Sequence, residues 1–118
     1  MINMEKNKVL IVEGSSDREK MEKLIKEPIE IVCTNGTISY SRLDEFVERF
    51  FDYDVYILVD SDTAGEKLRK QLKREFPLAK HLYIDKEYRE VATAPDYHLA
   101  TELVRANIDV HVNYLNER

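Results

Sequence analysis

Three acidic residues follow two strongly apolar segments of the chain. Glu13 comes directly after residues 9–12, and Asp60 and Asp62 follow residues 55–59. If both segments are strands of one parallel sheet, their carboxyl ends open onto a shared crevice and hold these carboxylates rigidly. Clustered carboxylates repel one another, so we expect a cation to join them. Their hard oxygens favour Mg²⁺, with Mn²⁺ as an alternative, over Zn²⁺.

The spacing of Asp60 and Asp62 suits a shared cation. Residues two apart in an extended segment point to the same side, so both carboxylates can reach one ion. Glu13 would join them from the neighbouring strand, as a ligand or as a group that moves protons. An ion held there polarises phosphoryl oxygens and activates water. We therefore predict that Glu13, Asp60 and Asp62 are both metal-binding and catalytic.

The three glycines of the chain lie just beyond the predicted ends of the first three strands. They are Gly14, Gly36 and Gly65. Because glycine lets the backbone approach a ligand closely, we predict that these turns contact substrate.

Asp17 and Lys67 complete the predicted substrate-binding set. Lys67 is a candidate contact to phosphate, and Asp17 lies shortly after the first strand. Two of the acids also have structural interpretations. Asp62 suits the N-cap of the helix that follows it, and the charge of Asp17 suits the first turn of another helix.

The composition is that of a soluble globular domain. The chain has 118 residues, of which 43% are hydrophobic and 35% are charged. We predict one domain over residues 1–118, because this length suits a single core. The longest apolar run is residues 55–59, far short of a membrane span, so we expect a cytoplasmic protein without a membrane partner.

The net charge of −5 argues against a free-standing binder of long nucleic acids, because such binding depends on neutralising phosphates. Basic residues nevertheless crowd the segment after Asp62: Lys67, Arg69, Lys70, Lys73 and Arg74. This run is either a basic strip near the site or the solvated face of a helix.

Apolar runs alternate with helical patterns, which is typical of βα units that build a parallel sheet. Strands are predicted over residues 8–13, 29–33, 55–60 and 80–84. Helices are predicted with Ser16 and Ser41 as caps, up to the break at Pro77, and from Pro95 with Leu99, Leu103 and Val104 facing inward. Residues 85–94 are expected to be irregular. The tail after Asn107 fits a short edge strand or a helical ending.

The first and third strands are unbroken apolar runs and should be buried on both faces, so they should be central neighbours. Counting strands along the chain, the predicted order is 2-1-3-4. The fold class is α/β, a Rossmann-like three-layer α/β/α arrangement of a mainly parallel sheet. Its core would span about 8–84, with a C-terminal helical extension over 95–118. The reversal of strand order places Glu13 beside Asp60.

These motifs resemble the Toprim domain family. The resemblance covers roughly residues 8–84 and rests on Glu13-Gly14 with Asp17, Asn35-Gly36-Thr37, and the segment 59–65, Val-Asp-Ser-Asp-Thr-Ala-Gly. Residues 60–73 with Lys80-His81 are most similar to a small, primase-like ribonuclease group that matures ribosomal RNA. The resemblance implies magnesium on Asp60 and Asp62, with Glu13 as the acid or base in phosphodiester chemistry.

Several functions fit these acidic residues. The leading one is magnesium-dependent cleavage of RNA or DNA. Larger family members carry separate substrate-recognition regions, so we expect a protein partner, a homodimer or a very small substrate to make up for that region here. One alternative is a noncatalytic module that binds metal and nucleic acid in a processing complex. Another is a receiver-like phosphoacceptor domain, which also gathers acids around magnesium at strand ends.

Overall fold

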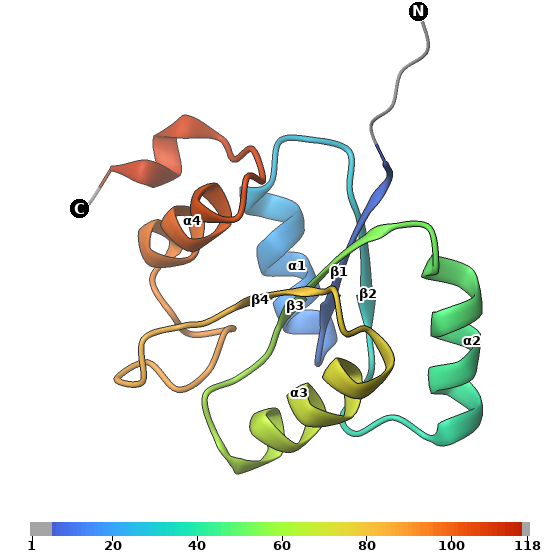
Figure 1. Cartoon of the computed structure of the whole chain (residues 1–118). Helices are drawn as coiled ribbons and strands as arrows, with labels where there is room; N and C mark the ends of the chain where they lie inside the picture. Colours follow the sequence, from blue (N-terminus) through green and yellow to red (C-terminus); the bar gives the residue numbers. More distant parts are fainter. Residues whose placement is uncertain (1–5, 117–118) are drawn as a thin grey trace, which may run out of the picture.

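The computed structural model describes residues 6–116 and contains a four-stranded parallel sheet (Figure 1). Its strands are β1 (Lys8–Val12), β2 (Glu30–Cys33), β3 (Asp54–Leu58) and β4 (Lys80–Leu82). Four α-helices and one 3₁₀ helix alternate with or follow them: α1 (Ser15–Leu24), α2 (Tyr40–Phe50), α3 (Thr63–Glu75), α4 (Asp96–Arg105) and η1 (Val112–Leu115). The strand order β2-β1-β3-β4 confirms the prediction.

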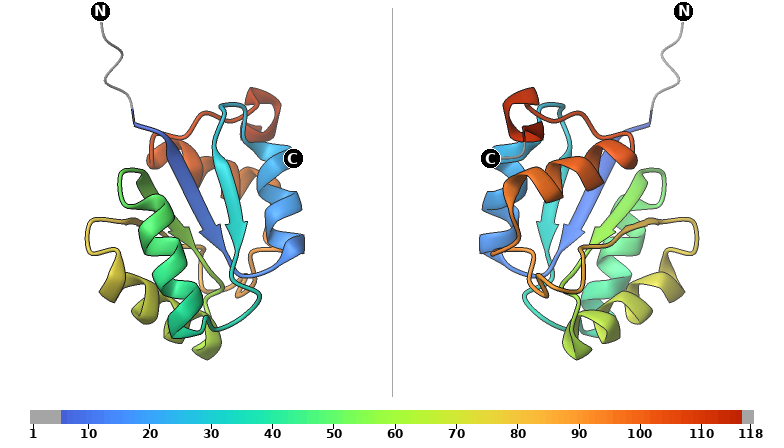
Figure 2. Two further views of the ribbon diagram at one scale, coloured as in Figure 1. Left: turned by 90° about the vertical axis from the view of Figure 1, so that its right-hand side faces the viewer. Right: turned by 90° about the vertical axis from the view of Figure 1, so that its left-hand side faces the viewer.

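Helices cover both faces of the sheet, which confirms the three-layer α/β/α class. In the two side views α2 and α3 lie on one face, and α1 and α4 lie on the other (Figure 2). The side chains of β1 alternate between two apolar clusters. Leu10 and Val12 belong to the cluster of α1 and α4, whereas Val9 and Ile11 belong to that of α2 and α3. All four are fully buried, as expected for a central strand.

Two helices begin earlier than predicted. Helix α1 has Gly14, not Ser16, as its N-cap, because the Asp17 carboxylate reaches back to accept the Gly14 N–H at 3.0 Å. Helix α2 is capped by Ser39 rather than Ser41, and the Ser39 hydroxyl accepts the Arg42 N–H at 3.3 Å. In both cases a nearby polar group satisfies a free N–H of the first turn.

The C-terminal segment packs on the α1 side of the sheet. Leu99 and Leu103 of α4 are fully buried as predicted, but the prediction for Val104 is wrong, since 44% of it is exposed. The tail after Asn107 contains elements of both predicted alternatives, the edge strand and the helical ending. Val110 forms an isolated antiparallel bridge with Ile25, and the 3₁₀ helix η1 follows it. No helix within residues 6–116 has the length and apolarity needed to cross a bilayer.

Gly65 packs directly against the segment that follows β3, so the structure leaves no room for a side chain at this position. A Cβ at residue 65 would lie 2.8 Å from the carbonyl carbon of Asp60 and closer still to its oxygen. We expect Gly65→Ala to lower the free energy of unfolding by about 3 kcal/mol, the scale of overpacking, in urea titrations followed by circular dichroism.

The matched control for this prediction is Gly14→Ala. Gly14 has an extended φ of −133°, and its added Cβ would meet only the Asp17 carboxylate at 3.7 Å. We expect this variant to lose no more than about 1 kcal/mol. Equal stability of the two variants would contradict the close approach of α3 to β3.

Candidate active site

Parallel pairing brings the predicted acidic residues to one edge of the sheet. Strand β1 pairs with β3 in a register that aligns Ile11 with Ile57. Glu13, two residues beyond Ile11, therefore lies level with the end of β3, next to Asp60. The two residues are also bonded directly, since Glu13 Oε1 accepts the Asp60 N–H at 3.0 Å. This hydrogen bond fixes the half-buried Glu13 side chain across the gap between the two strand ends.

Asp60 is also held by a loop that lies far away in sequence. Its Oδ1 accepts the Val91 N–H at 2.8 Å, and the neighbouring Ser61 N–H donates to the Arg89 carbonyl at 2.6 Å. The sequence predicted residues 85–94 only as an irregular segment. The structure makes this loop one wall of the site.

Asp62 and Asp17 hold the starts of two helices. Asp62 is the N-cap of α3, and its Oδ1 accepts the Gly65 N–H at 2.7 Å. Asp17 is buried and accepts the Gly14 N–H. The structural interpretation of both residues is therefore confirmed. Capping uses one carboxylate oxygen of Asp62 and does not exclude a ligand on the other.

The conformation of the turn after β2 explains why residue 36 is a glycine. Asn35 and Gly36 have positive φ angles of 60° and 96°, a conformation that glycine adopts at little cost. The Asn35 N–H donates to the Glu13 carbonyl at 2.7 Å, which ties this turn to the end of β1. The glycine turns thus have internal roles in the fold, and substrate contact by Gly14, Gly36 and Gly65 stays a prediction.

The acidic residues repel one another. Burial is the largest cause that raises the pKa of the Glu13 carboxyl; the hydrogen bond from the Asp60 N–H opposes it, and the charges of Asp60, Asp62 and Asp17 add to the rise. Burial is also the largest cause that raises the pKa values of Asp60 and Asp17. The charges of nearby acids, including Glu90, raise both pKa values further. Glu90 was absent from the predicted site, because no sequence pattern places its loop there.

The donor chemistry fits a hard divalent cation, although the ligands are not preassembled. Glu13, Asp60 and Asp62 offer only oxygens, and within residues 6–116 just one oxygen of each accepts a hydrogen bond. In the same part of the chain, no three Asp, Glu, His or Cys side chains converge on a point that would hold an ion. Metal binding by these three residues therefore stays a prediction.

Comparison with known proteins decides the family. The Toprim domain model matches residues 8–93, which includes the loop that holds Asp60. The chain belongs to the Toprim domain family. Its match extends past the predicted limit of residue 84.

Relatives of this Toprim chain include both small and longer proteins. It is 57% identical over 114 residues to "Uncharacterized protein YusF" of Bacillus subtilis strain 168, covering 97% of this chain and 78% of that one. A solved structure titled as a small TOPRIM domain protein from Bacillus stearothermophilus is 55% identical, with a TM-score of 0.91 over 96% of both chains.

Two further relatives of this Toprim chain are named Ribonuclease M5. That of Fusobacterium nucleatum is 28% identical over 116 residues, and that of Staphylococcus aureus is 29% identical over 85. The alignments cover 92% and 71% of this chain but only 63% and 47% of those proteins. The Toprim chain thus spans less than two thirds of these ribonucleases.

The raised carboxyl pKa values predict a pH-dependent cost to stability. An acid whose pKa is higher in the folded state stabilises the fold below its ordinary pKa, and this contribution is lost as the pH rises through the folded-state value. We expect Asp60→Asn to be more stable than the wild type at pH 7, by about 1 kcal/mol, because Asn keeps an acceptor for Val91 without the charge.

Urea unfolding at pH 7 and pH 4 measures this effect. The advantage of Asp60→Asn should shrink at pH 4, where the wild-type cluster is more protonated. Asp44→Asn, an exposed site on α2, is the control and should lack this pattern. An Asp60→Asn variant that is less stable than the wild type at pH 7 would contradict repulsion within the cluster.

Proposed function

We propose that this Toprim chain is a magnesium-dependent phosphodiester hydrolase that cleaves RNA. Membership of the Toprim family and the relatives named Ribonuclease M5 support a role in nucleic-acid processing, and the name of those relatives favours RNA over DNA. The observation that carries the proposal is the hydrogen bond from the Asp60 N–H to Glu13, because it holds a candidate proton carrier beside the candidate ligands.

The residues divide the chemistry between them. Asp60 and Asp62 would hold Mg²⁺, or Mn²⁺ in its place, and the bound ion would polarise a phosphate oxygen and stabilise charge that develops during the reaction. Glu13 would accept or donate the proton of the reacting oxygen. Its raised pKa suits that task, since an acid or base works best when its pKa approaches the working pH.

Substrate recognition would be shared with a second component. We propose that a protein partner or a second copy of this chain contributes recognition, because a net charge of −5 disfavours binding of long nucleic acids by this chain alone. Processing of cellular RNA agrees with a cytoplasmic location, which belongs to the same proposal. Because the chain belongs to the Toprim family, the receiver-like phosphoacceptor interpretation is disfavoured.

Cleavage of labelled RNA tests the proposal. With Mg²⁺ present, Glu13→Gln should lower the cleavage rate by about 100-fold or more, because the amide neither accepts nor donates the proton that the reaction requires. Glu45→Gln, an exposed site on α2, should cleave like the wild type. Removal of divalent ions with EDTA should abolish cleavage, and full activity of Glu13→Gln would sink the proposed mechanism.

A noncatalytic module that binds metal and nucleic acid is the second candidate. The structural roles of Asp62 and Asp17 favour it, because both carboxylates hold helix starts and these roles require no catalysis. Isothermal titration calorimetry with Mg²⁺ separates the two candidates when it is combined with the cleavage assay. Magnesium uptake that Asp60→Asn abolishes, without cleavage of single-stranded or paired RNA, would identify the binding module.

A further inference from the structure

A groove with basic walls begins at the acidic site. It has a volume of about 940 Å³ and runs from Ser61 and Asp62 between α3 and the segment after β4. Four cationic side chains and two carboxylates line it: Lys67, Lys70, Lys86, Arg89, Asp62 and Glu66. In a chain whose net charge is −5, this excess of positive charge is local.

The four cations are available to a ligand. All of them are exposed, and none forms an ion pair within the part of the chain that the structure describes. Lys20 and Lys23, by contrast, are both paired with Asp96. Lys67 and Lys70 lie one helical turn apart and so face the same side of α3. Anion binding would therefore break no ion pair among the described residues.

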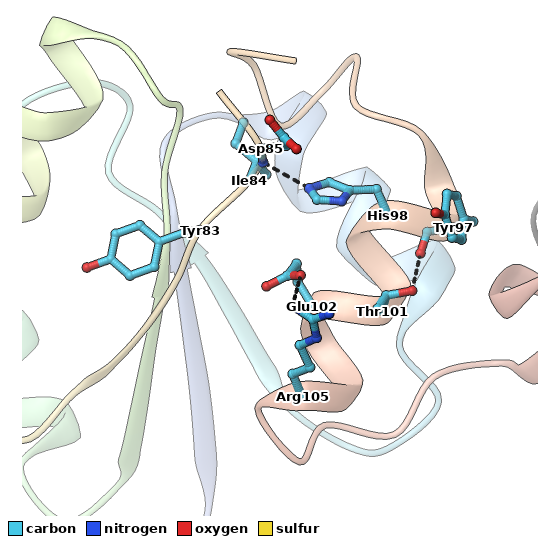
Figure 3. Close-up of a pocket in the computed structure, with 8 residues that line it drawn as sticks. All are labelled: Tyr83, Ile84, Asp85, Tyr97, His98, Thr101, Glu102 and Arg105. Atoms are coloured by element: carbon cyan, nitrogen blue, oxygen red, sulfur yellow. Dashed lines mark hydrogen bonds and ion pairs between the residues drawn. The ribbon is translucent and has the colours of Figure 1, made fainter. Parts of the chain in front are cut away.

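The loop that carries Lys86 and Arg89 is anchored at both ends. At its start, the Asp85 N–H donates to Nε2 of His98 on α4 at 3.0 Å (Figure 3). At its end, the Arg89 carbonyl accepts the Ser61 N–H, and Arg89 itself takes a left-handed φ of 58°. This uncommon conformation is held by contacts to the acidic site. The basic wall is thus fixed relative to Asp60.

Tyr83 adds an aromatic surface to the groove. The residue is 57% exposed, and its ring extends away from the α4 side chains in Figure 3. The guanidinium carbon of Arg69 lies 4.1 Å from the ring centroid. Arg69 is only 6% exposed and is held by bonds of 3.0 Å to the Leu82 carbonyl and to Nδ1 of His81. A buried cation therefore supports the ring from one side and limits its motion.

We propose that this groove is the path of a single nucleic-acid strand that leaves the acidic site. Lys67, Lys70, Lys86 and Arg89 contact successive phosphates, and Tyr83 stacks on an unpaired base. The stacked base selects a single strand, because the bases of a duplex already stack on one another and do not present a free face. The inference rests on the proposed function for its substrate class.

Binding without turnover tests the phosphate contacts. Fluorescence anisotropy measures the affinity for a labelled 12-nucleotide single-stranded RNA. The protein carries Glu13→Gln and the buffer contains EDTA, so that no RNA is cleaved. The affinity is followed between 50 and 200 mM KCl, roughly the range over which phosphate contacts lose affinity. Replacing Lys67 and Lys70 by Ala should weaken binding and reduce the slope of log affinity against log salt by about 1.4, since each contact to a single strand contributes about 0.7.

The control for this variant removes the same charge from the same helix. Lys73 and Arg74 are exposed at the other end of α3, outside the groove. Their double Ala variant should keep the wild-type salt slope. Equal slopes in both double variants, or no binding of this RNA by the parent protein, would overturn the groove as the binding path.

Two substitutions of Tyr83 test whether its ring stacks on a base. Tyr83→Ala should weaken binding of the single-stranded RNA by about 10-fold, whereas Tyr83→Phe, which keeps the stacking surface, should bind within about twofold of the parent. Phe51→Ala, at an exposed aromatic residue outside the groove, should have no effect. Weaker binding of a duplex of the same sequence is expected. Equal loss in Tyr83→Phe and Tyr83→Ala would overturn stacking.

These experiments separate the inference from the proposed function. If groove variants lose binding while no RNA is cleaved, the hydrolase fails and the groove stands. If the protein cleaves RNA while the groove variants bind it normally, the hydrolase stands and the groove fails.

Discussion

The pairing of β1 with β3 is the constraint on which the rest of the site depends. The two strands align Ile11 with Ile57, and both contribute side chains to the apolar clusters on each face of the sheet. A shift by one residue would turn buried side chains toward the wrong cluster, so burial specifies the register strongly. The same register sets Glu13 beside the N–H of Asp60. The geometry of the acidic residues therefore follows from the packing of the core.

The acidic edge opposes the stability that this core provides. Burial and mutual repulsion raise the pKa values of Glu13, Asp17 and Asp60, so keeping all three ionised at neutral pH has a free-energy cost. Backbone N–H groups compensate in part, because each of these carboxylates accepts one such bond. A protein that needed only a stable fold would gain from neutral side chains here. Retained repulsion is typical of sites that bind cations or move protons.

Sequence patterns predicted the sheet and the position of the acidic residues, because both depend on local signals. Two unbroken apolar runs identify central strands, and the residues that end them lie at the crevice. The patterns failed where long-range contacts decide. Val104 directly follows the fully buried Leu103 in α4 but is itself 44% exposed. The bond from the Val91 N–H to Asp60 joins residues 31 apart, and no periodicity in residues 85–94 indicates it.

The loop that brings Val91 to Asp60 also reconciles the overall charge with the proposed function. A net charge of −5 would disfavour nucleic acid if it were spread evenly, because affinity for a polyanion depends on local phosphate neutralisation. The loop at residues 85–91 prevents an even spread. One contact of this loop holds Asp60, and its side chains Lys86 and Arg89 face α3 across the groove. A single structural element thus connects the acidic edge to the basic groove, so a change that displaces the loop would disturb both together.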